Sequence, residues 1–543
     1  MEKRTGSKIL VECLENEGVD YIFGIPGEQT TPVMEELRES SIDFITTRHE
    51  QGAAFMADVY SRVTGDTGVC LSTLGPGATN LLTGVGNASL DHSSVVALTS
   101  QRETSDKHKH SHQLVDTNSI FEAVTKLTDE VRNAESIPEQ VRKSFEVAQR
   151  EKRGATHLEL PLDVTLETAD VNPLESSKNR VSPSGVQKSN IDAALGMVKE
   201  ADNPIVLAGQ SVLSQNGGNR LEAFCESSGI PAVTTFMGKG SISARHDKSV
   251  GTIGFGADDY AMEAVKQADM VITIGYDYIE FHPENWNIGE EKSIIHIDST
   301  PPEIDRHYGV KMTLIGNISR ILEQMNKRTE QYASDSYSQE LKSNFQEKMK
   351  EEYAENENPP FTPQQTVKAI RQILSDDDIL ISDVGSHKYW FSRRYPTYEP
   401  GTFIVSNGFA SMGVAVPGCI SASLCSDNNA VAVTGDGGFM MNMQEIETAS
   451  RIGVDPTIVV LDDEEYTAIS MEQNDDYGEL YGSSFDNPEF KELAESFGVE
   501  GYRIDKEDQF IEKLSEAVKS DSVSVVSVPI DPEESYELEK EIR

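Results

Sequence analysis

The chain has 543 residues, which is too many for one hydrophobic core, so we expect about three domains. Aspartate and glutamate number 91 against 47 lysines and arginines, giving a formal net charge of −44 that is spread along the whole chain. This charge argues against nucleic acid and anionic membranes as partners, because both need a positive protein surface. A spread acidic surface is typical of proteins from a very salty cytoplasm, so we expect a halophilic protein.

Residues 1–20 have the pattern of an amphipathic helix with acidic residues throughout, and not that of a signal peptide. No apolar run approaches the 18 or so residues of a membrane span. The cysteines are sparse and show no CxxC spacing, which indicates reduced thiols. They are Cys13, Cys70, Cys225, Cys419 and Cys425. We therefore expect a cytoplasmic protein.

Short apolar runs that end in Gly, Ser or Thr, each followed by a helical pattern, recur along the chain. This alternation is typical of open, mostly parallel α/β sheets. Two stretches break it: residues 171–189, rich in Ser, Pro and Asn, suggest a linker, and the charged residues 327–362 suggest a long surface helix. The sequence therefore predicts three doubly wound parallel-sheet domains, at about 1–170, 190–325 and 360–535.

Three histidines, His108, His110 and His112, alternate along one predicted loop. Alternate spacing on an extended segment would permit a transition metal, but no carboxylate pattern accompanies them. We interpret them as part of a polar loop.

Residues 430–463 combine a predicted strand, a Gly-Asp-Gly-Gly turn, a helix and a second strand. Both strands of a right-handed βαβ unit end at the same sheet edge, so Asp436 and Asp463 are expected side by side. Two carboxylates beside a glycine-rich turn suit a hard octahedral cation that holds a diphosphate. The alternative is a plain turn with surface acids, and the paired strand end favours the metal.

The motif GDGGF (435–439), followed by acids at the next strand end, resembles the signature of enzymes that use thiamine diphosphate (ThDP). Further stretches resemble the acetolactate synthase branch of that superfamily over nearly the whole chain. They are YIFGIPGEQ (21–29), TTRHEQGAAFMADVYSRVTG (46–65), STLGPGATN (72–80), HLELPLDV (157–164), TTFMGKG (234–240), SDVGSHKYWF (382–391) and GFASMGVAVPG (408–418). The resemblance implies a pyrimidine-binding, a central and a diphosphate-binding domain, with ThDP and Mg²⁺ as cofactors.

The resemblance also implies roles for single residues. Glu50 matches the carboxylate that contacts the aminopyrimidine ring and allows ylid formation; without the surrounding match it would read as an ordinary acid at a helix N-terminus. Met412 matches the apolar wedge that bends ThDP, and the Ala410 carbonyl would receive the cofactor's amino group. Gln113 and Phe121 match residues that flank the bound 2-oxo acid. Gly27 lies in a turn that approaches the reacting carbon, for which simple turn geometry is the alternative.

The resemblance also implies which residues bind the diphosphate and the metal. The loop after one strand end resembles the loop that holds the diphosphate, and it comprises Val384, Gly385, Ser386 and His387. The turn of Gly435, Gly437 and Gly438 and the later Tyr466 belong to the same expected site. Asp436 and Asp463 would bind Mg²⁺ through their side chains and Glu465 through its carbonyl.

The branch of the family is indicated by ITIGYDYIEFHPENWN (272–287), which resembles the catabolic, flavin-independent synthases. FAD is therefore not expected, although the central domain could hold one. Glu28 and Gln29 depart from the catabolic pattern, which leaves substrate choice open. No Trp stands near Met471, Glu472 and Gln473, where biosynthetic enzymes carry one to favour 2-oxobutyrate, so we expect pyruvate as donor and acceptor. Asp462 stands where relatives usually have Asn; the extra acid either bonds a neighbouring amide or follows the acidic character of the whole chain.

The resemblance thus predicts an acetolactate synthase, which decarboxylates one pyruvate on ThDP and joins the hydroxyethyl unit to a second pyruvate to give 2-acetolactate. In this family the cofactor bridges two subunits, which implies a homodimer or homotetramer; a regulatory subunit is left open. The alternatives are another ThDP-dependent 2-oxo acid decarboxylase, a flavin-dependent pyruvate oxidase, or a ThDP-binding paralogue without catalysis.

Overall fold

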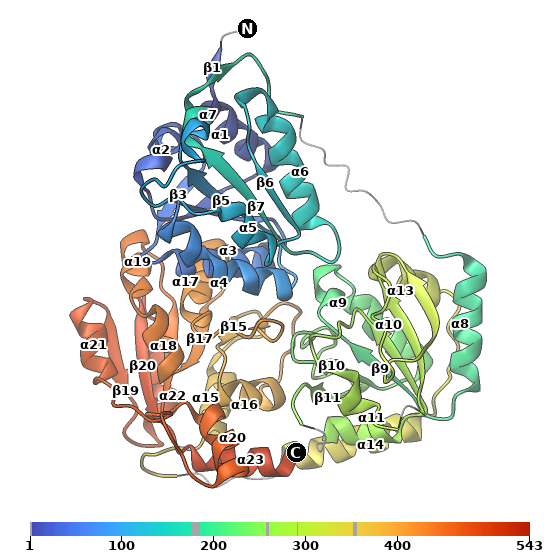
Figure 1. Ribbon diagram of the computed structural model, residues 1–543. Coiled ribbons are helices and arrows are strands. Elements are labelled where there is room, and N and C mark those ends of the chain that lie inside the picture. Colours follow the sequence, from blue (N-terminus) through green and yellow to red (C-terminus); the bar gives the residue numbers. More distant parts are fainter. Residues whose placement is uncertain (1–2, 176–184, 257–259, 290, 351–355, 543) are drawn as a thin grey trace.

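The computed structural model describes residues 3–175, 185–256, 260–289, 291–350 and 356–542. Three six-stranded parallel sheets, each flanked by helices, organise these residues and confirm the predicted fold class (Figure 1). We call them, with their helices, the N-terminal unit (β2–β7), the central unit (β9–β14) and the C-terminal unit (β15–β20). Figure 1 shows the N-terminal unit in blue above the other two.

The N-terminal unit has the strand order β3-β2-β4-β5-β7-β6. Its first helix, α1 (Gly6–Glu17), is the expected amphipathic helix; the Thr5 hydroxyl caps it by accepting from the Lys8 backbone N–H. The strands are β2 (Tyr21–Gly24), β3 (Asp43–Thr46), β4 (Gly68–Ser72), β5 (Val95–Gln101), β6 (Leu127–Glu130) and β7 (Ala155–Pro161), and a short β1 (Arg4–Thr5) pairs with β8 (Thr168–Ala169). The other helices are α2 (Thr31–Leu37), α3 (Glu50–Thr64), α4 (Pro76–Leu90), α5 (Thr117–Glu122), α6 (Ile137–Gln149) and α7 (Leu162–Leu166).

The central unit has the order β11-β10-β9-β12-β13-β14, which is the 3-2-1-4-5-6 order of dinucleotide-binding sheets. Its strands are β9 (Pro204–Ala208), β10 (Ala232–Thr235), β11 (Ser249–Ile253), β12 (Met270–Ile274), β13 (Ser293–Asp298) and β14 (Val310–Ile315). Its helices are α8 (Lys188–Glu200), α9 (Ser211–Ser214), α10 (Gly218–Ser228), α11 (Tyr260–Gln267), α12 (Pro283–Trp286), α13 (Ile318–Asn326) and α14 (Asp335–Met349). α14 lies in the charged stretch where a surface helix was expected. Most of the predicted linker, residues 176–184, lies outside the described residues.

The C-terminal unit has the order β16-β15-β17-β18-β20-β19. Numbered within each unit, this is 2-1-3-4-6-5, the same order as in the N-terminal unit. Its strands are β15 (Ile379–Ser382), β16 (Phe403–Val405), β17 (Ala430–Gly435), β18 (Thr457–Asp462), β19 (Glu500–Arg503) and β20 (Ser524–Pro529). Its helices are α15 (Pro363–Ile373), α16 (Ser386–Arg394), α17 (Ala415–Cys425), α18 (Asp436–Asn442), α19 (Glu445–Ile452), α20 (Thr467–Tyr477), α21 (Phe490–Ser496), α22 (Gln509–Val518) and α23 (Glu533–Ile542).

All five cysteines are free thiols, in agreement with their spacing. Within the part of the chain that the structure describes, no helix is both long and apolar enough to cross a bilayer.

One hydrophobic core is shared by the N-terminal and C-terminal units, and α3 packs along α17 at its centre. The approach is close: a Cβ added at Gly418 would lie 2.7 Å from a Val59 methyl group. The Ser421 hydroxyl donates to the Met56 carbonyl across the contact, at 2.8 Å. Because interiors are close-packed, this contact fixes the start of α3 relative to the C-terminal sheet.

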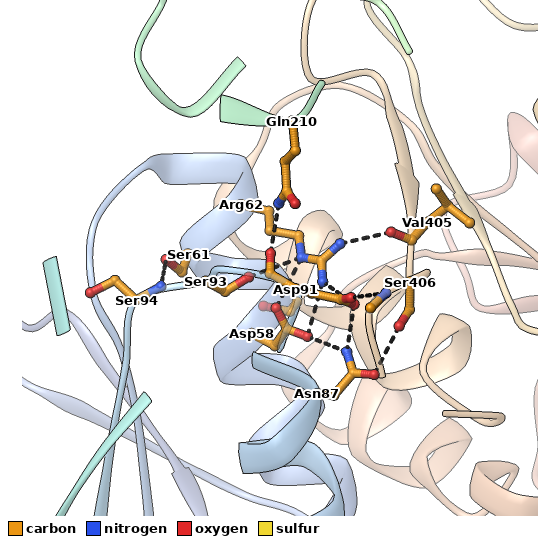
Figure 2. Close-up of polar contacts among 12 residues, drawn as sticks. Asp58, Ser61, Arg62, Asn87, Asp91, Ser93, Ser94, Gln210, Val405 and Ser406 are labelled. Atoms are coloured by element: carbon orange, nitrogen blue, oxygen red, sulfur yellow. Dashed lines mark hydrogen bonds and ion pairs between the residues drawn. The ribbon is translucent and has the colours of Figure 1, made fainter. Parts of the chain in front are cut away.

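A buried ion network lies where the three units meet (Figure 2). The Arg62 guanidinium donates to Asp58 (3.0 Å) and Asp91 (2.6 Å) and to the Val405 carbonyl of the C-terminal unit (2.9 Å). Asp91 accepts from the Gly408 backbone N–H at 2.7 Å through its carboxylate, and its carbonyl accepts from the Gln210 amide of the central unit at 2.7 Å. Arg62 and Asp91 therefore join all three units.

Arg62→Met should destabilise the protein by about 3–5 kcal/mol, because it leaves two carboxylates buried without their cation. The control is Arg38→Met: Arg38 pairs with Glu35 and Glu39 on the surface and its side chain is 65% exposed, so its loss should cost under about 1 kcal/mol. Denaturation midpoints of both variants in the same molar KCl buffer measure the difference. Equal midpoints would contradict this role of the network.

Candidate active site

The carboxyl ends of β17 and β18 bring two aspartates together. The strands are parallel neighbours with Gly435 opposite Leu461. Asp436 follows β17 and begins α18, and Asp463 follows β18. The Asp436 carboxylate accepts from the Gly437 N–H (2.6 Å), the Glu464 N–H (2.7 Å) and the Asp463 N–H (3.3 Å). The side-by-side placement expected from the βαβ pattern is therefore observed.

Burial raises the pKa of both carboxyl groups. Burial raises the pKa of Asp436 to about 6, and burial together with the nearby Asp436 charge raises the pKa of Asp463 to about 8. The Thr467 hydroxyl donates to Asp463. A divalent cation between the two carboxylates would remove their repulsion and replace the water they have lost, so the pair fits a metal.

Glu465 presents its main chain to this pair. Its extended segment pairs antiparallel with Ser484, through bonds from Phe485 N–H to the Glu464 carbonyl (3.0 Å) and from Tyr466 N–H to the Ser483 carbonyl (2.8 Å). In such a pair the N–H and C=O of Glu465 face away from Ser484, and its N–H reaches the Asp463 carboxylate.

The Glu465 side chain is used elsewhere, since its carboxylate accepts from the Tyr536 hydroxyl at 2.8 Å. In the described ranges, no group of three or more His, Cys, Asp or Glu side chains is arranged to hold a metal. A cation here would therefore take two carboxylates, a main-chain oxygen and oxygens of a ligand. The exposed loop with His108, His110 and His112 forms no such group either.

The segment Val384–His387 lies beside the glycine turn. Ser386 begins α16, and a Cβ added at Gly435 would lie 3.5 Å from His387 Nδ1. Burial lowers the pKa of His387 to about 3, so the ring is neutral. Its Nε2 is buried and has no hydrogen-bond partner among the described residues. A buried ring nitrogen without a partner, next to a glycine turn, indicates room for a ligand at this place.

Met412 and Tyr466 meet at the glycine turn. A Cβ added at Gly437 would lie 2.5 Å from the Tyr466 ring and 3.4 Å from Met412 Cε, so only glycine fits there. Ala410 has φ +54°, a left-handed conformation that is uncommon for alanine. The predicted cofactor residues of the C-terminal unit thus gather at one sheet edge.

Asp383, which the sequence reading did not select, holds this edge together. Its fully buried carboxylate accepts from the Val384 N–H (2.7 Å), the Gly413 N–H (2.8 Å) and the Thr434 hydroxyl (3.0 Å). It joins the ends of β15 and β17 to the loop that carries Met412. The rule that pointed to Asp436, an acid at a strand end, would also have found Asp383.

Three predicted residues of the N-terminal unit gather around residues 73–77, which form the turn after β4 and the start of α4. A Cβ added at Gly27 would lie 2.4 Å from Thr73, one at Gly75 would lie 3.0 Å from Gln113 Cβ, and one at Gly77 would lie 3.2 Å from a Glu50 carboxylate oxygen. Glu50 is the first residue of α3, is 7% exposed and accepts from the Asn80 amide at 2.9 Å. Asn80 was not selected from the sequence.

Phe121 is placed differently from these three. It is fully buried in the hydrophobic core and stacks on His157, with ring centroids 4.0 Å apart, whereas Gln113 is exposed. The structure therefore does not bring Phe121 and Gln113 into one group.

The two halves of the site belong to different sheets. The Arg48 and His49 backbone N–H groups, just before Glu50, donate to the Glu445 carboxylate of α19 at 3.0–3.1 Å. Glu445 thus holds the start of α3 against the C-terminal unit.

In the central unit, Glu280 occupies the point of the sheet where ligands usually bind. The strand order changes direction between β9 and β12. There the Glu280 carboxylate accepts from the Gln210 N–H (3.1 Å), the Asp277 N–H (3.0 Å) and the Thr235 hydroxyl. Burial raises the pKa of Glu280 to about 7. The backbone donors that an anionic ligand would use are therefore bonded to this chain's own carboxylate.

Comparison with known proteins agrees with this arrangement. Residues 4–120, 191–325 and 383–528 match the models of the N-terminal TPP binding domain, the central domain and the C-terminal TPP binding domain of thiamine pyrophosphate enzymes. The chain is 32% identical to acetolactate synthase of Bacillus subtilis, over 99% of this chain and 95% of that protein. It is 31% identical to the catabolic acetolactate synthase of Raoultella terrigena and 30% identical to the large subunit of acetolactate synthase isozyme 2 of Escherichia coli, each over 97% of this chain and 95% of that protein.

The three matched domains define an enzyme that uses thiamine pyrophosphate, the diphosphate cofactor expected above. Within this class, the chain belongs to the acetolactate synthase family.

The free energy of unfolding of Glu280→Gln, measured relative to that of the wild type, should increase as the pH rises. Because the Glu280 carboxyl has its pKa raised from 4.5 to about 7 by folding, the wild-type folded state loses stability between these pH values. Glutamine stays neutral and can still accept from Asp277 and donate to Thr235. The variant's relative stability should therefore rise by roughly 3 kcal/mol between about pH 4.5 and pH 7 and stay level above. Denaturation of both proteins at pH 5 and pH 8 measures this change; a pH-independent difference would contradict it.

Proposed function

We propose that this chain is an acetolactate synthase that uses pyruvate as donor and acceptor, with ThDP and Mg²⁺ as cofactors. The observation that carries the proposal is the shared edge of β17 and β18, where two buried carboxylates, a glycine turn, the Met412 loop and the free His387 nitrogen converge. The names of the relatives supply the reaction. We also propose that the three units are domains with the boundaries that the sequence predicts.

In the proposed mechanism, each residue binds the cofactor, orients it or transfers a proton. ThDP, when bound, supplies the carbanion that attacks the 2-oxo acid and accepts the electrons released by decarboxylation. Asp436, Asp463 and the Glu465 carbonyl would hold Mg²⁺, and the segment with His387 would lie against the diphosphate. Met412 would pack against the cofactor, and the Ala410 carbonyl would accept from its amino group.

Glu50 would exchange a proton with the aminopyrimidine ring. Its burial at the start of α3 keeps water away, and the Asn80 amide holds one carboxylate oxygen. Gln113 and Gly27, grouped near Glu50 around the turn at 73–77, would line the substrate side. We infer a 2-oxo acid without strong selection for an extra methylene, because Met471 is buried, Glu472 is exposed and neither supplies an aromatic wall.

The active site is proposed to lie between two copies of the chain. Large apolar side chains are exposed on the segments that border the metal edge, a pattern typical of an interface. They are Phe409, Met440, Met441, Tyr466 and Ile469. A second copy that brought its own Glu50 to this edge would cover them. FAD is not part of the proposal, because Glu280 already bonds the backbone donors of the central unit.

The reaction is tested with purified protein, pyruvate, ThDP and Mg²⁺ in molar KCl, which the net charge of −44 calls for. We expect 2-acetolactate, measured as acetoin after acid treatment, with the same protein inactive at about 0.05 M salt. Acetaldehyde as the main product would instead show a simple decarboxylase, and hydrogen peroxide an oxidase. Bound ThDP without any turnover of pyruvate would show a paralogue without catalysis.

The shared site is tested by mixing two inactive variants. Glu50→Gln and Asp436→Asn should each lose at least about 100-fold in kcat as homo-oligomers, since each removes an essential half-site. Co-expressed with two different tags, a mixed dimer contains one site with both intact residues if the halves come from different chains. We expect a substantial part of the wild-type activity in the doubly purified dimer. Activity no higher than that of either parent would show that each chain builds its own site.

A further inference from the structure

The segment from Ser483 to Asn487 follows α20 and lies beside the carboxyl ends of β17 and β18, where the metal site is proposed. Its backbone pairs with Glu464 and Tyr466, as described above, and the Phe485 ring packs on the Tyr466 ring with centroids 4.8 Å apart. The segment thus lies along the residues that follow β18. It delivers one polar side chain, Asn487, to the carboxylates.

Asn487 bonds two carboxylates with one amide nitrogen. Its Nδ2 donates to Asp436 Oδ2 at 2.6 Å and to Asp462 Oδ1 at 2.8 Å. An amide nitrogen has two hydrogens, so each carboxylate receives one. Asp436 Oδ2 also accepts from the Glu464 N–H, while Oδ1 accepts from the Gly437 N–H. These bonds fix the rotation of the Asp436 carboxylate.

Asp462 helps to hold this amide in place by accepting one of its hydrogens. Its other oxygen lies 4.0 Å from Arg503 of β19, which also pairs with Glu489 at 3.2 Å. The Arg503 guanidinium therefore approaches the Asp462 oxygen that does not bond Asn487. Of the two explanations that the sequence leaves open for Asp462, the bond to a neighbouring amide is the one that the structure records.

We propose that Asn487 is a positioning residue for the metal site, and that it holds Asp436 in the orientation that binds a divalent cation. The proposal rests on the proposed Mg²⁺–ThDP site. A neutral amide suits this task for an electrostatic reason. A lysine or arginine in its place would neutralise Asp436 and compete with the cation, and an acid would repel both aspartates. Groups that orient a metal ligand typically change metal affinity by about 10- to 100-fold when removed.

The experiment is a Mn²⁺ titration followed by electron paramagnetic resonance, with saturating ThDP and no substrate. Asn487→Ala should bind Mn²⁺ about 10- to 100-fold more weakly than the wild type. The matched control is Asp486→Ala, in the same segment: Asp486 is exposed and makes no contact with the carboxylate pair that the structure records. Its affinity should stay within about 3-fold of the wild type. Thermal unfolding without metal tests whether Asn487→Ala remains folded, with a midpoint close to that of Asp486→Ala expected.

Steady-state kinetics separate positioning from a general structural defect. For Asn487→Ala, the Mg²⁺ concentration at half-maximal rate should rise by the same factor as the Mn²⁺ dissociation constant, with kcat recovered at saturating Mg²⁺. A lower kcat at every Mg²⁺ concentration with unchanged Mn²⁺ affinity would overturn the proposal for Asn487 alone. Absence of Mn²⁺ binding by the wild type would overturn the metal site itself, and this inference with it.

Discussion

Burial of the Arg62 guanidinium between Asp58 and Asp91 is the interaction on which the arrangement of the three units depends. The same Asp91 bonds the Gly408 backbone of the C-terminal unit and, through its carbonyl, the Gln210 side chain of the central unit. A charge network in this position is costly unless every member is bonded, so it tolerates one arrangement of the units and penalises others. Gly408 also begins the stretch that leads to Ala410 and Met412, so the junction and the candidate site share one loop.

The N-terminal and C-terminal units share one strand order, 2-1-3-4-6-5, and each gathers its predicted residues at carboxyl ends of its strands. One contributes Glu50, held by the Asn80 amide; the other contributes the aspartate pair, in which Asp436 is held by the Asn487 amide. In both cases a buried acid is kept in place by amide donors and not by a cation. This leaves the acids free for the partners that we propose for them, an aminopyrimidine ring for Glu50 and a metal for the aspartate pair.

The strand ends were predictable from sequence because apolar runs followed by Gly or acid mark where parallel strands finish, and neighbouring strands must finish together. That reasoning gave the fold class, the start of α3 and the pairing of Asp436 with Asp463. It could not give Asn487, which lies 51 positions after Asp436 and reaches it only because its segment pairs with Glu464 and Tyr466. The same holds for the bonds of Glu280 with Thr235 and of Arg62 with Val405, which join residues far apart in the chain. The interior position of Phe121 was missed because a family match fixes a residue's position in the chain and not its packing.

We propose that the edge of β17 and β18 holds a divalent cation with its diphosphate cofactor. Anomalous diffraction from crystals grown with Mn²⁺ and ThDP tests it most directly. We expect a manganese peak within coordination distance of the Asp436 and Asp463 carboxylates and the Glu465 carbonyl, next to the diphosphate. A peak at another site, or ThDP bound with no manganese between these residues, would contradict it.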